Sequence, residues 1–165
     1  MPYPPVAVDR YWNVVDMDVA AALFTHDVDP ELLGPPLNVY RLSLHPEGLA
    51  PRVVNFAELA DHLLHRLRHD VEVSAAPDLA ALLEEVERYP DVRALPRRPV
   101  ERHGIVVPIR LRTPQGGLSM FSTITTSGTP VDVTAAELAL ETFFPADAET
   151  AAHLNAAAST VERAG

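Results

Sequence analysis

The sequence contains no cysteine, no long apolar run and no targeting segment. The absence of cysteine from its 165 residues excludes disulfide bonds, thiolate metal sites and cysteine nucleophiles. No run of about 18 apolar residues occurs, and no basic segment followed by an apolar core stands at the amino terminus. The sequence therefore predicts neither a membrane span nor a signal peptide, and we expect a soluble, cytoplasmic protein.

Basic residues are also scarce relative to acidic ones. The chain has 13 basic and 23 acidic side chains, which give a formal net charge of −10. A negative surface repels the phosphates of nucleic acids, so this chain alone is expected to bind DNA poorly. Apolar residues make up 47% of the sequence, and a chain of this length can bury roughly 70% of its unfolded surface. These values predict one globular domain over residues 1–165.

The clearest strand signals lie in the carboxy-terminal part of the chain. Residues 104–113 alternate between two faces with a period of two, and residues 118–127 are rich in β-branched and aromatic side chains. The break at residues 114–117 between them predicts a hairpin. Residues 135–144 contain the helix-favouring Ala, Leu and Glu, but their alternation and the proline that follows them favour a third strand.

A second hairpin is predicted near the amino terminus. Two short apolar runs, residues 6–9 and 13–17, flank a turn. Asp18 then precedes an Ala-rich segment that ends near His26, and its side chain can accept the free N–H groups of a first helical turn. Strand, turn, strand and capped helix in this order resemble the opening of a PAS domain.

Three further helices are predicted along the chain. Asn55 and Glu58 have the spacing of a capping box ahead of an apolar helical stripe. Pro77 stands at the first turn of a second helix. Asp147 caps a closing helix over residues 148–163, whose apolar stripe is mostly Ala. Such a stripe packs weakly, or packs closely against a second copy of itself.

Two segments carry weaker signals. The period of residues 37–44 is ambiguous, and residues 91–101 are expected to form a connector. Because an antiparallel sheet needs a cover on at least one face, the helices are expected to supply it. The predicted fold class is α+β, with a PAS-like antiparallel sheet covered by helices.

One stripe of acidic and imidazole side chains could hold zinc. Glu58, His62, His65 and His69 share one face of the predicted helix. Two neighbouring arginines would oppose a bound dication, so a solvated face that carries histidines is the favoured interpretation.

No catalytic motif is evident. A Gly-x-Ser-x-Gly elbow is absent, although serine, histidine and aspartate all occur. Capping at a turn and at a helix start explains Asp9, Asp16 and Asp18 without catalysis. The pair Gly116 and Gly117 is expected in a hairpin turn, because no helix follows it as in a phosphate loop. We therefore expect no enzyme activity, no metal and no cofactor.

Arg41 lies within an apolar run and needs a partner. A guanidinium there must pair with a carboxylate or a carbonyl group or leave the interior. A ligand carboxylate is one candidate. A protein acid such as Glu58 or Asp61, or a carbonyl at a helix end, is the favoured partner.

Large, flexible apolar side chains favour a cavity between the helices and the sheet. Ordinary core packing is the alternative for any single one of them. A ligand carboxylate in this cavity could pair with Arg41 or Arg68. The predicted ligand-binding residues are Met17, Phe24, Tyr40, Arg41, Phe56, Leu59, Leu63, Arg68, Met120, Phe121 and Ile124.

Four phrases of the sequence, in the same order, resemble a known family. They are residues 8–15 (VDRYWNVV), 42–52 (LSLHPEGLAPR), 121–134 (FSTITTSGTPVDVT) and 143–147 (FFPAD). On these phrases the chain resembles, over nearly its whole length, the MmyB-like ligand-binding domain of XRE-family transcription regulators from actinobacteria. One departure is Asp18, where relatives commonly carry Asn.

The resemblance implies a sensor of a bacterial transcription regulator. In that family a helix-turn-helix DNA-binding domain precedes a PAS-like domain, and at least one member holds a fatty acid. The chain would be the effector domain without its DNA-binding domain, and it would bind an apolar or fatty-acyl molecule between sheet and helices. DNA would be a partner only through the helix-turn-helix domain that is absent from this chain, and a second copy would be a partner in a homodimer.

Two other functions stay open. The first is a dimerisation or protein-interaction module with no small ligand. The second, less favoured, is a small enzyme that acts on an apolar substrate, which would require an acid or a base inside the cavity.

Overall fold

The computed structural model describes residues 5–18, 22–96, 106–114, 116–126 and 138–164. The strands are β1 (Pro5–Asp9), β2 (Val14–Met17), β3 (Ile109–Thr113), β4 (Gly116–Thr126) and β5 (Leu138–Pro145). The helices are α1 (Ala22–Thr25), α2 (Pro30–Leu33), α3 (Val39–Leu44), α4 (Phe56–Ser74), α5 (Pro77–Glu87), α6 (Pro90–Arg93) and α7 (Ala148–Ala164), with a 3-10 turn at Ala50–Arg52. Within these described ranges, no helix combines the length and the apolar character that crossing a membrane requires.

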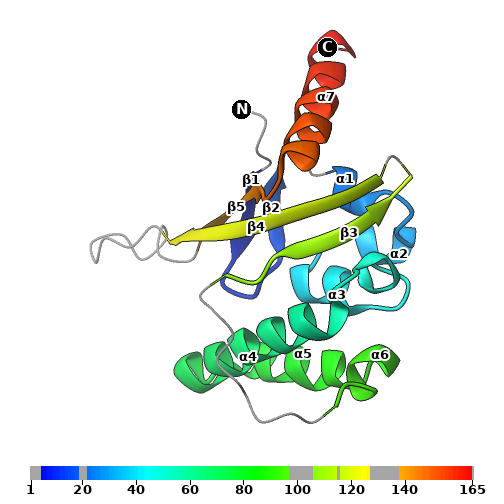
Figure 1. The fold of residues 1–165 in the computed structure, drawn as a ribbon. Helices are drawn as coiled ribbons and strands as arrows, with labels where there is room; N and C mark the ends of the chain where they lie inside the picture. The colour runs from blue at the N-terminus through cyan, green and yellow to red at the C-terminus, as the bar shows by residue number, and fades with distance from the viewer. Residues whose placement is uncertain (1–4, 19–21, 97–105, 115, 127–137, 165) are drawn as a thin grey trace.

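The strands form one antiparallel sheet in the order β2-β1-β5-β4-β3 (Figure 1). β1 pairs with β5 from Pro5, opposite Thr142, to Asp9, opposite Leu138. This pairing joins the amino-terminal hairpin to the carboxy-terminal strands in the middle of the sheet. The prediction of an α+β fold with a PAS-like antiparallel sheet covered by helices is confirmed. The third strand, predicted over residues 135–144, is found as β5 from Leu138, and residues 135–137 lie outside the described part of the chain.

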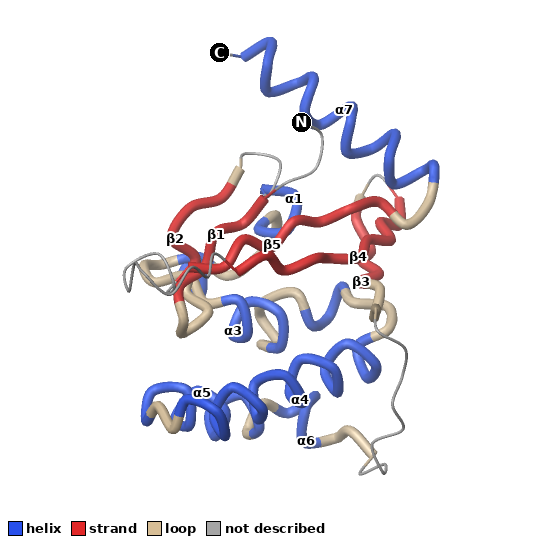
Figure 2. The backbone as a smooth tube through the Cα atoms, turned by 90° about the vertical axis from the view of Figure 1, so that its left-hand side faces the viewer, coloured by secondary structure: helices blue, strands red, loops and turns tan. Residues whose placement is uncertain are grey.

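Helices cover one face of the sheet in layers. α3 lies next to the sheet, and the adjacent pair α4 and α5 lies beyond α3 (Figures 1 and 2). α7 lies on the opposite side and projects away from the sheet. The hydroxyl of Thr150 in the first turns of α7 accepts a hydrogen bond from the backbone N–H of Ser119 in β4, at 2.9 Å. This contact joins the base of α7 to the sheet.

The core fills much of the space between sheet and helices. Val8, Leu111 and Met120 of the strands are fully buried, as is Leu67 of α4. Burial of a side chain of this size contributes about 1.5–3 kcal/mol before the entropy of ordering it is subtracted.

Asn38 explains why residues 39–44, in the segment with the ambiguous period, form the helix α3. Its side-chain oxygen accepts hydrogen bonds from the backbone N–H groups of Tyr40 and Arg41, at 3.0 and 3.3 Å. Its amide nitrogen donates to the carbonyl of Tyr11 and to the side-chain oxygen of Asn13, each at 3.0 Å. The same side chain therefore caps α3 and fastens it to the turn between β1 and β2.

The predicted capping box at Asn55 is wrong, although α4 begins where it was expected. The Asn55 side chain makes no capping hydrogen bond to the helix. Its amide donates to the carboxylate of Glu58 and to the carbonyl of Pro108, and its oxygen accepts from the N–H of Arg110. The Asn55 side chain is therefore hydrogen-bonded to the backbone at the start of β3 and not to the backbone N–H groups of α4.

Other boundaries differ by a few residues. β3 begins at Ile109, whereas the strand was expected from residue 104, and residues 104 and 105 lie outside the described part of the chain. The expected connector, residues 91–101, overlaps α6, a single helical turn that begins at Pro90. At the closing helix, a carboxylate oxygen of Asp147 accepts a hydrogen bond from the N–H of Thr150 at 2.7 Å, as the cap prediction required.

Candidate ligand-binding pocket

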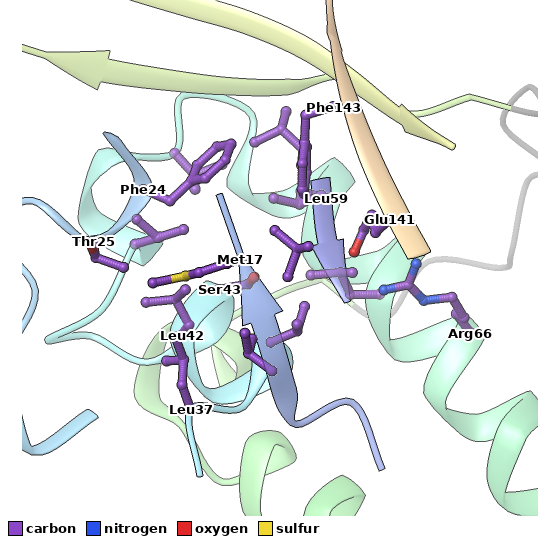
Figure 3. A pocket seen from close by; sticks show the side chains of 17 residues that line it. Met17, Phe24, Thr25, Leu37, Leu42, Ser43, Leu59, Arg66, Glu141 and Phe143 are labelled. Atoms are coloured by element: carbon purple, nitrogen blue, oxygen red, sulfur yellow. The ribbon is translucent and has the colours of Figure 1, made fainter. Parts of the chain in front are cut away.

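A pocket lies between the inner face of the sheet and helices α1, α3 and α4 (Figure 3). Its volume is about 70 Å³, roughly half of the 150 Å³ of an engineered apolar cavity that binds benzene. The apolar lining residues are Val6, Val14, Met17, Phe24, Leu37, Val39, Leu42, Leu49, Val53, Leu59, Leu63, Ile109 and Phe143, and the polar ones are Thr25, Ser43, Arg66 and Glu141. Such a lining suits a small, mainly apolar molecule.

Met17 connects the pocket with solvent. Its side chain lines the pocket and is also 38% exposed. Farther inside, the rings of Phe24 and Phe143 contact each other, with centres 4.8 Å apart. Because methionine is unbranched and flexible, Met17 can change rotamer at low cost, and its position marks the mouth of the pocket.

Arg66 brings a positive charge to one end of the pocket (Figure 3). Its Nε donates to the hydroxyl of Tyr40 at 3.0 Å, and its guanidinium carbon lies 4.1 Å from the centre of the Trp12 ring. Burial raises the pKa of Tyr40 to about 12, so the hydroxyl stays protonated at neutral pH and does not neutralise the arginine. The Nη2 atom of Arg66 is buried without a hydrogen-bond acceptor in the described part of the chain.

Glu141 brings a carboxylate to the same end. It lies on the central strand β5, lines the pocket and is only 4% exposed. One of its carboxylate oxygens accepts a hydrogen bond from the hydroxyl of Ser122 at 2.7 Å. In the view of Figure 3, Glu141 and Arg66 both lie at the same edge of the pocket. The pocket is therefore apolar along its length and polar at one end.

Four of the predicted ligand-binding residues line this pocket. They are Met17, Phe24, Leu59 and Leu63. The other seven lie elsewhere, for reasons that differ from residue to residue.

Arg41 and Arg68, the predicted partners of a ligand carboxylate, each pair with a glutamate of α5. Arg41 donates twice to Glu85, from Nε and Nη2 at 2.8 Å each. Arg68 donates to Glu87, at 2.7 Å for the shorter contact. The favoured prediction for Arg41 was a protein acid as its partner. The partner is an acid, but it is Glu85 and neither Glu58 nor Asp61.

The remaining predicted residues belong to the core or to the sheet's other parts. Tyr40 is fully buried and does not line the pocket, but its hydroxyl accepts a hydrogen bond from Nε of Arg66. Met120 is fully buried, and Phe56 is partly buried against the core. Phe121 stacks on Phe144 of the neighbouring strand, with ring centres 5.5 Å apart, and Ile124 is 38% exposed.

The histidine stripe of α4 lies outside the pocket lining. His62 is half-buried, and His65 and His69 are exposed. Burial first, and then the charge of Arg66, lowers the pKa of His62. Among the residues that the structure describes, no group of three His, Cys, Asp or Glu side chains could hold a metal ion.

Comparison with protein families identifies the chain. The family model of the MmyB-like transcription regulator ligand binding domain matches residues 1–157. The chain belongs to this family. No curated protein matches the sequence. The family membership agrees with the resemblance drawn from the sequence phrases, and it makes this domain the ligand-binding part of a transcription regulator.

The polar end of this MmyB-like domain's pocket was missed by sequence reasoning, although signals for it exist. Arg66 follows Leu59 and Leu63 by seven and three residues, which puts it on the same helical face. Glu141 precedes Phe143 by two residues, which puts both on one face of a strand. A charged residue on an otherwise apolar face of a helix or strand therefore indicates the polar end of the pocket.

Proposed function

We propose that this domain senses an apolar small molecule, such as a fatty-acyl chain, and thereby modulates DNA binding by the helix-turn-helix domain of its regulator in the cytoplasm. The observation that carries the proposal is the apolar pocket with a buried arginine donor at one end. An unmet buried donor costs about 1–3 kcal/mol, which a ligand acceptor would recover. Membership of a ligand-binding family supports the same function.

The size of the pocket favours a short chain. About three methylenes would contribute roughly 2.4 kcal/mol on burial, at about 0.8 kcal/mol each, before the costs of association are subtracted. A longer acyl chain needs more room than about 70 Å³ provides. It would have to displace Met17 and extend through the mouth of the pocket.

A route for the signal runs along β5. Glu141 and Phe143 line the pocket, and β5 leads within three residues of its end into α7. A ligand that favours one position of β5 over another would therefore bias the direction in which α7 projects. We infer that α7, with its Ala-rich stripe, contacts a second copy in a homodimer, and that the ligand adjusts this contact.

The alternatives have less support. A protein-interaction module without a ligand does not require a cavity. This domain, however, has an apolar cavity beside its core. An enzyme needs an acid or base that acts on the substrate. The lining includes Glu141 but no histidine, and Glu141 already accepts the hydroxyl of Ser122.

Native mass spectrometry tests the proposal. The purified domain is mixed with saturated fatty acids and their primary amides of increasing chain length, and lipid extracted from untreated protein is analysed in parallel. We expect one bound molecule per domain for the short and medium chains. Leu63→Phe, which fills the pocket, should abolish the adduct. Val73→Phe, on the exposed side of the same helix, should leave it unchanged.

Two results would contradict the proposal. One is the absence of an adduct with every fatty acid, every amide and every extracted lipid. The other is an adduct that Leu63→Phe and Val73→Phe affect equally, since that pattern would locate binding outside the pocket. Light scattering of the same samples tests the homodimer, which a monomer mass at all concentrations would rule out.

A further inference from the structure

The polar end of the pocket holds two opposite charges that do not pair with each other. Arg66 and Glu141 both line the pocket, but no ion pair joins them. The Nη2 of Arg66 is buried and lacks an acceptor within the described residues, and Glu141 is 4% exposed. A group that lies between them would meet a hydrogen-bond donor on one side and an acceptor on the other.

Both charges are fixed in place by the protein. The Arg66 guanidinium rests on the Trp12 ring and donates to the Tyr40 hydroxyl. Glu141 sits on the central strand, where the hydroxyl of Ser122 holds one carboxylate oxygen. A ligand must therefore adapt to this pair, because neither side chain can leave without breaking a contact that holds it.

The charge of the ligand decides how well it fits. A carboxylate would gain the contact with Arg66 but would lie beside the carboxylate of Glu141, and like charges in a desolvated site repel strongly. An ammonium group would meet the same difficulty beside Arg66. A neutral group that accepts one hydrogen bond and donates another satisfies both residues and adds no charge.

The geometry points to a ligand with a neutral head group that both accepts and donates a hydrogen bond, such as a primary amide or an alcohol, on a short apolar chain. The head group accepts from Nη2 of Arg66 and donates to the carboxylate of Glu141. This inference rests on the proposed function, since it names the class of molecule that the same pocket selects. It separates the amide and alcohol derivatives of an acyl chain from the free acid.

Four six-carbon compounds with different head groups test the inference: hexanamide and hexanoate share a pentyl chain, and hexan-1-ol and hexylamine share a hexyl chain. Their affinities for the domain are measured at neutral pH by calorimetry and by chemical-shift changes of the pocket methyl groups. We expect hexanamide and hexan-1-ol to bind about tenfold or more tightly than hexanoate and hexylamine, which corresponds to about 1.4 kcal/mol.

Two variants change the charge balance of the Arg66 and Glu141 pair. Glu141→Gln keeps an acceptor for Ser122 and removes the negative charge, so hexanoate should gain affinity while hexylamine does not. Arg66→Gln removes the positive charge, so hexylamine should gain while hexanoate weakens further. If either variant fails to fold, as judged by its thermal transition, the order of the four affinities in the unaltered domain decides whether the head-group inference holds.

The outcomes separate the two proposals. If hexanoate binds as tightly as hexanamide or more tightly, the head-group inference is overturned and the pocket remains a ligand site. If all four bind equally, the head group is not recognised and the inference is again overturned. If none of the four causes a heat or a methyl shift, both the inference and the proposed function fail.

Discussion

The guanidinium carbon of Arg66 lies 4.1 Å from the centre of the Trp12 ring, so a helix residue rests on the turn of a distant hairpin. Asp70, one helical turn beyond Arg66, accepts a hydrogen bond from Nε1 of the same Trp12 at 2.9 Å. The backbone of Trp12 has φ 64°, which costs a bulky residue about 1–3 kcal/mol. The two contacts from α4 hold Trp12 in this conformation, and Trp12 in turn directs Arg66 toward the pocket.

Replacement of Tyr40 by Phe tests how Arg66 is held. The change removes the oxygen that accepts from Nε of Arg66 but keeps the aromatic ring. Because a partly buried charged donor loses its acceptor, we expect a loss of about 1–3 kcal/mol in the free energy of unfolding, measured in urea. Ligand affinity should fall severalfold, since the guanidinium can then rotate.

Tyr11→Phe is the matched control for this change. The hydroxyl of Tyr11 accepts from Arg10 in an exposed contact at 2.6 Å. An exposed contact of this kind contributes about 0–1 kcal/mol, so stability and ligand affinity should stay close to those of the parent. Equal losses in the two variants would show that Tyr40 has no special role in positioning Arg66.

Glu85→Gln tests the ion pair that joins α3 to α5. Glu85 accepts two hydrogen bonds from Arg41 and one from the hydroxyl of Tyr89. The side chains of Arg41 and Glu85 are 38% and 40% exposed, so solvent screens the pair and we expect a loss of about 0.5–1 kcal/mol at neutral pH. Ligand affinity should not change, since neither residue lines the pocket.

The pH dependence of this pair has a definite sign. The hydrogen bonds from Arg41 lower the pKa of Glu85 from its ordinary value of 4.5. The stabilisation is therefore present above about pH 4.5 and is lost as the pH falls through the lower pKa of the folded state. Glu85→Gln should flatten the acid side of the stability curve. Glu84 forms a more exposed i,i+4 pair with Arg88, so Glu84→Gln should leave the acid side of the stability curve as in the parent.

The positions of the strands and of the longest helices followed from the sequence, because period and punctuation are local signals. Which side of a strand points into the core did not follow from the sequence. Leu138 and Leu140 are 44% and 43% exposed, whereas Glu141 of the same strand is buried. The pairing of β5 with β1, which sets Glu141 opposite the buried Val6, fixes the inner face. That partner lies more than a hundred residues away, and no local pattern identifies it.

The pocket was predictable as a kind of site but not in its polar contacts. A guanidinium inside an apolar run drew attention to Arg41, yet its partner Glu85 comes from a helix 44 residues farther along the chain. Helical spacing alone puts Arg66 on the face of Leu63, and this was the more informative signal. The helical conformation of α3 depends on Asn38, whose capping role was also readable from the residue type.

His62→Gln should reduce the sensitivity of the fold to mild acid. Burial, followed by the charges of Arg66 and His65, lowers the pKa of His62 from 6.5, against the opposing effect of Glu141 and Asp61. The unfolded chain therefore binds a proton more readily than the folded domain does. Stability should fall as the pH drops below about 6.5 toward the folded pKa, and the glutamine variant should lack this part of the loss.

Thermal transitions measured at several pH values between about 7 and 5 check the His62 prediction. The slope of the transition temperature against pH should be shallower for His62→Gln than for the parent. His69→Gln, at an exposed position of the same helix, should retain the parent slope. Identical slopes for the parent and for His62→Gln would contradict the prediction.

Gly48→Ala should destabilise the domain because a backbone oxygen occupies the space that a methyl group needs. A Cβ at Gly48 would overlap the carbonyl oxygen of Leu42, which accepts a hydrogen bond from the backbone N–H of Leu49. Relief requires a shift of the turn after α3, with a cost of about 1–3 kcal/mol in urea unfolding. Leu42 and Leu49 line the pocket, so ligand affinity should fall as well. Gly117→Ala, where a Cβ meets nothing within 4 Å, should change stability by less than about 0.5 kcal/mol, and equal effects would refute the steric explanation.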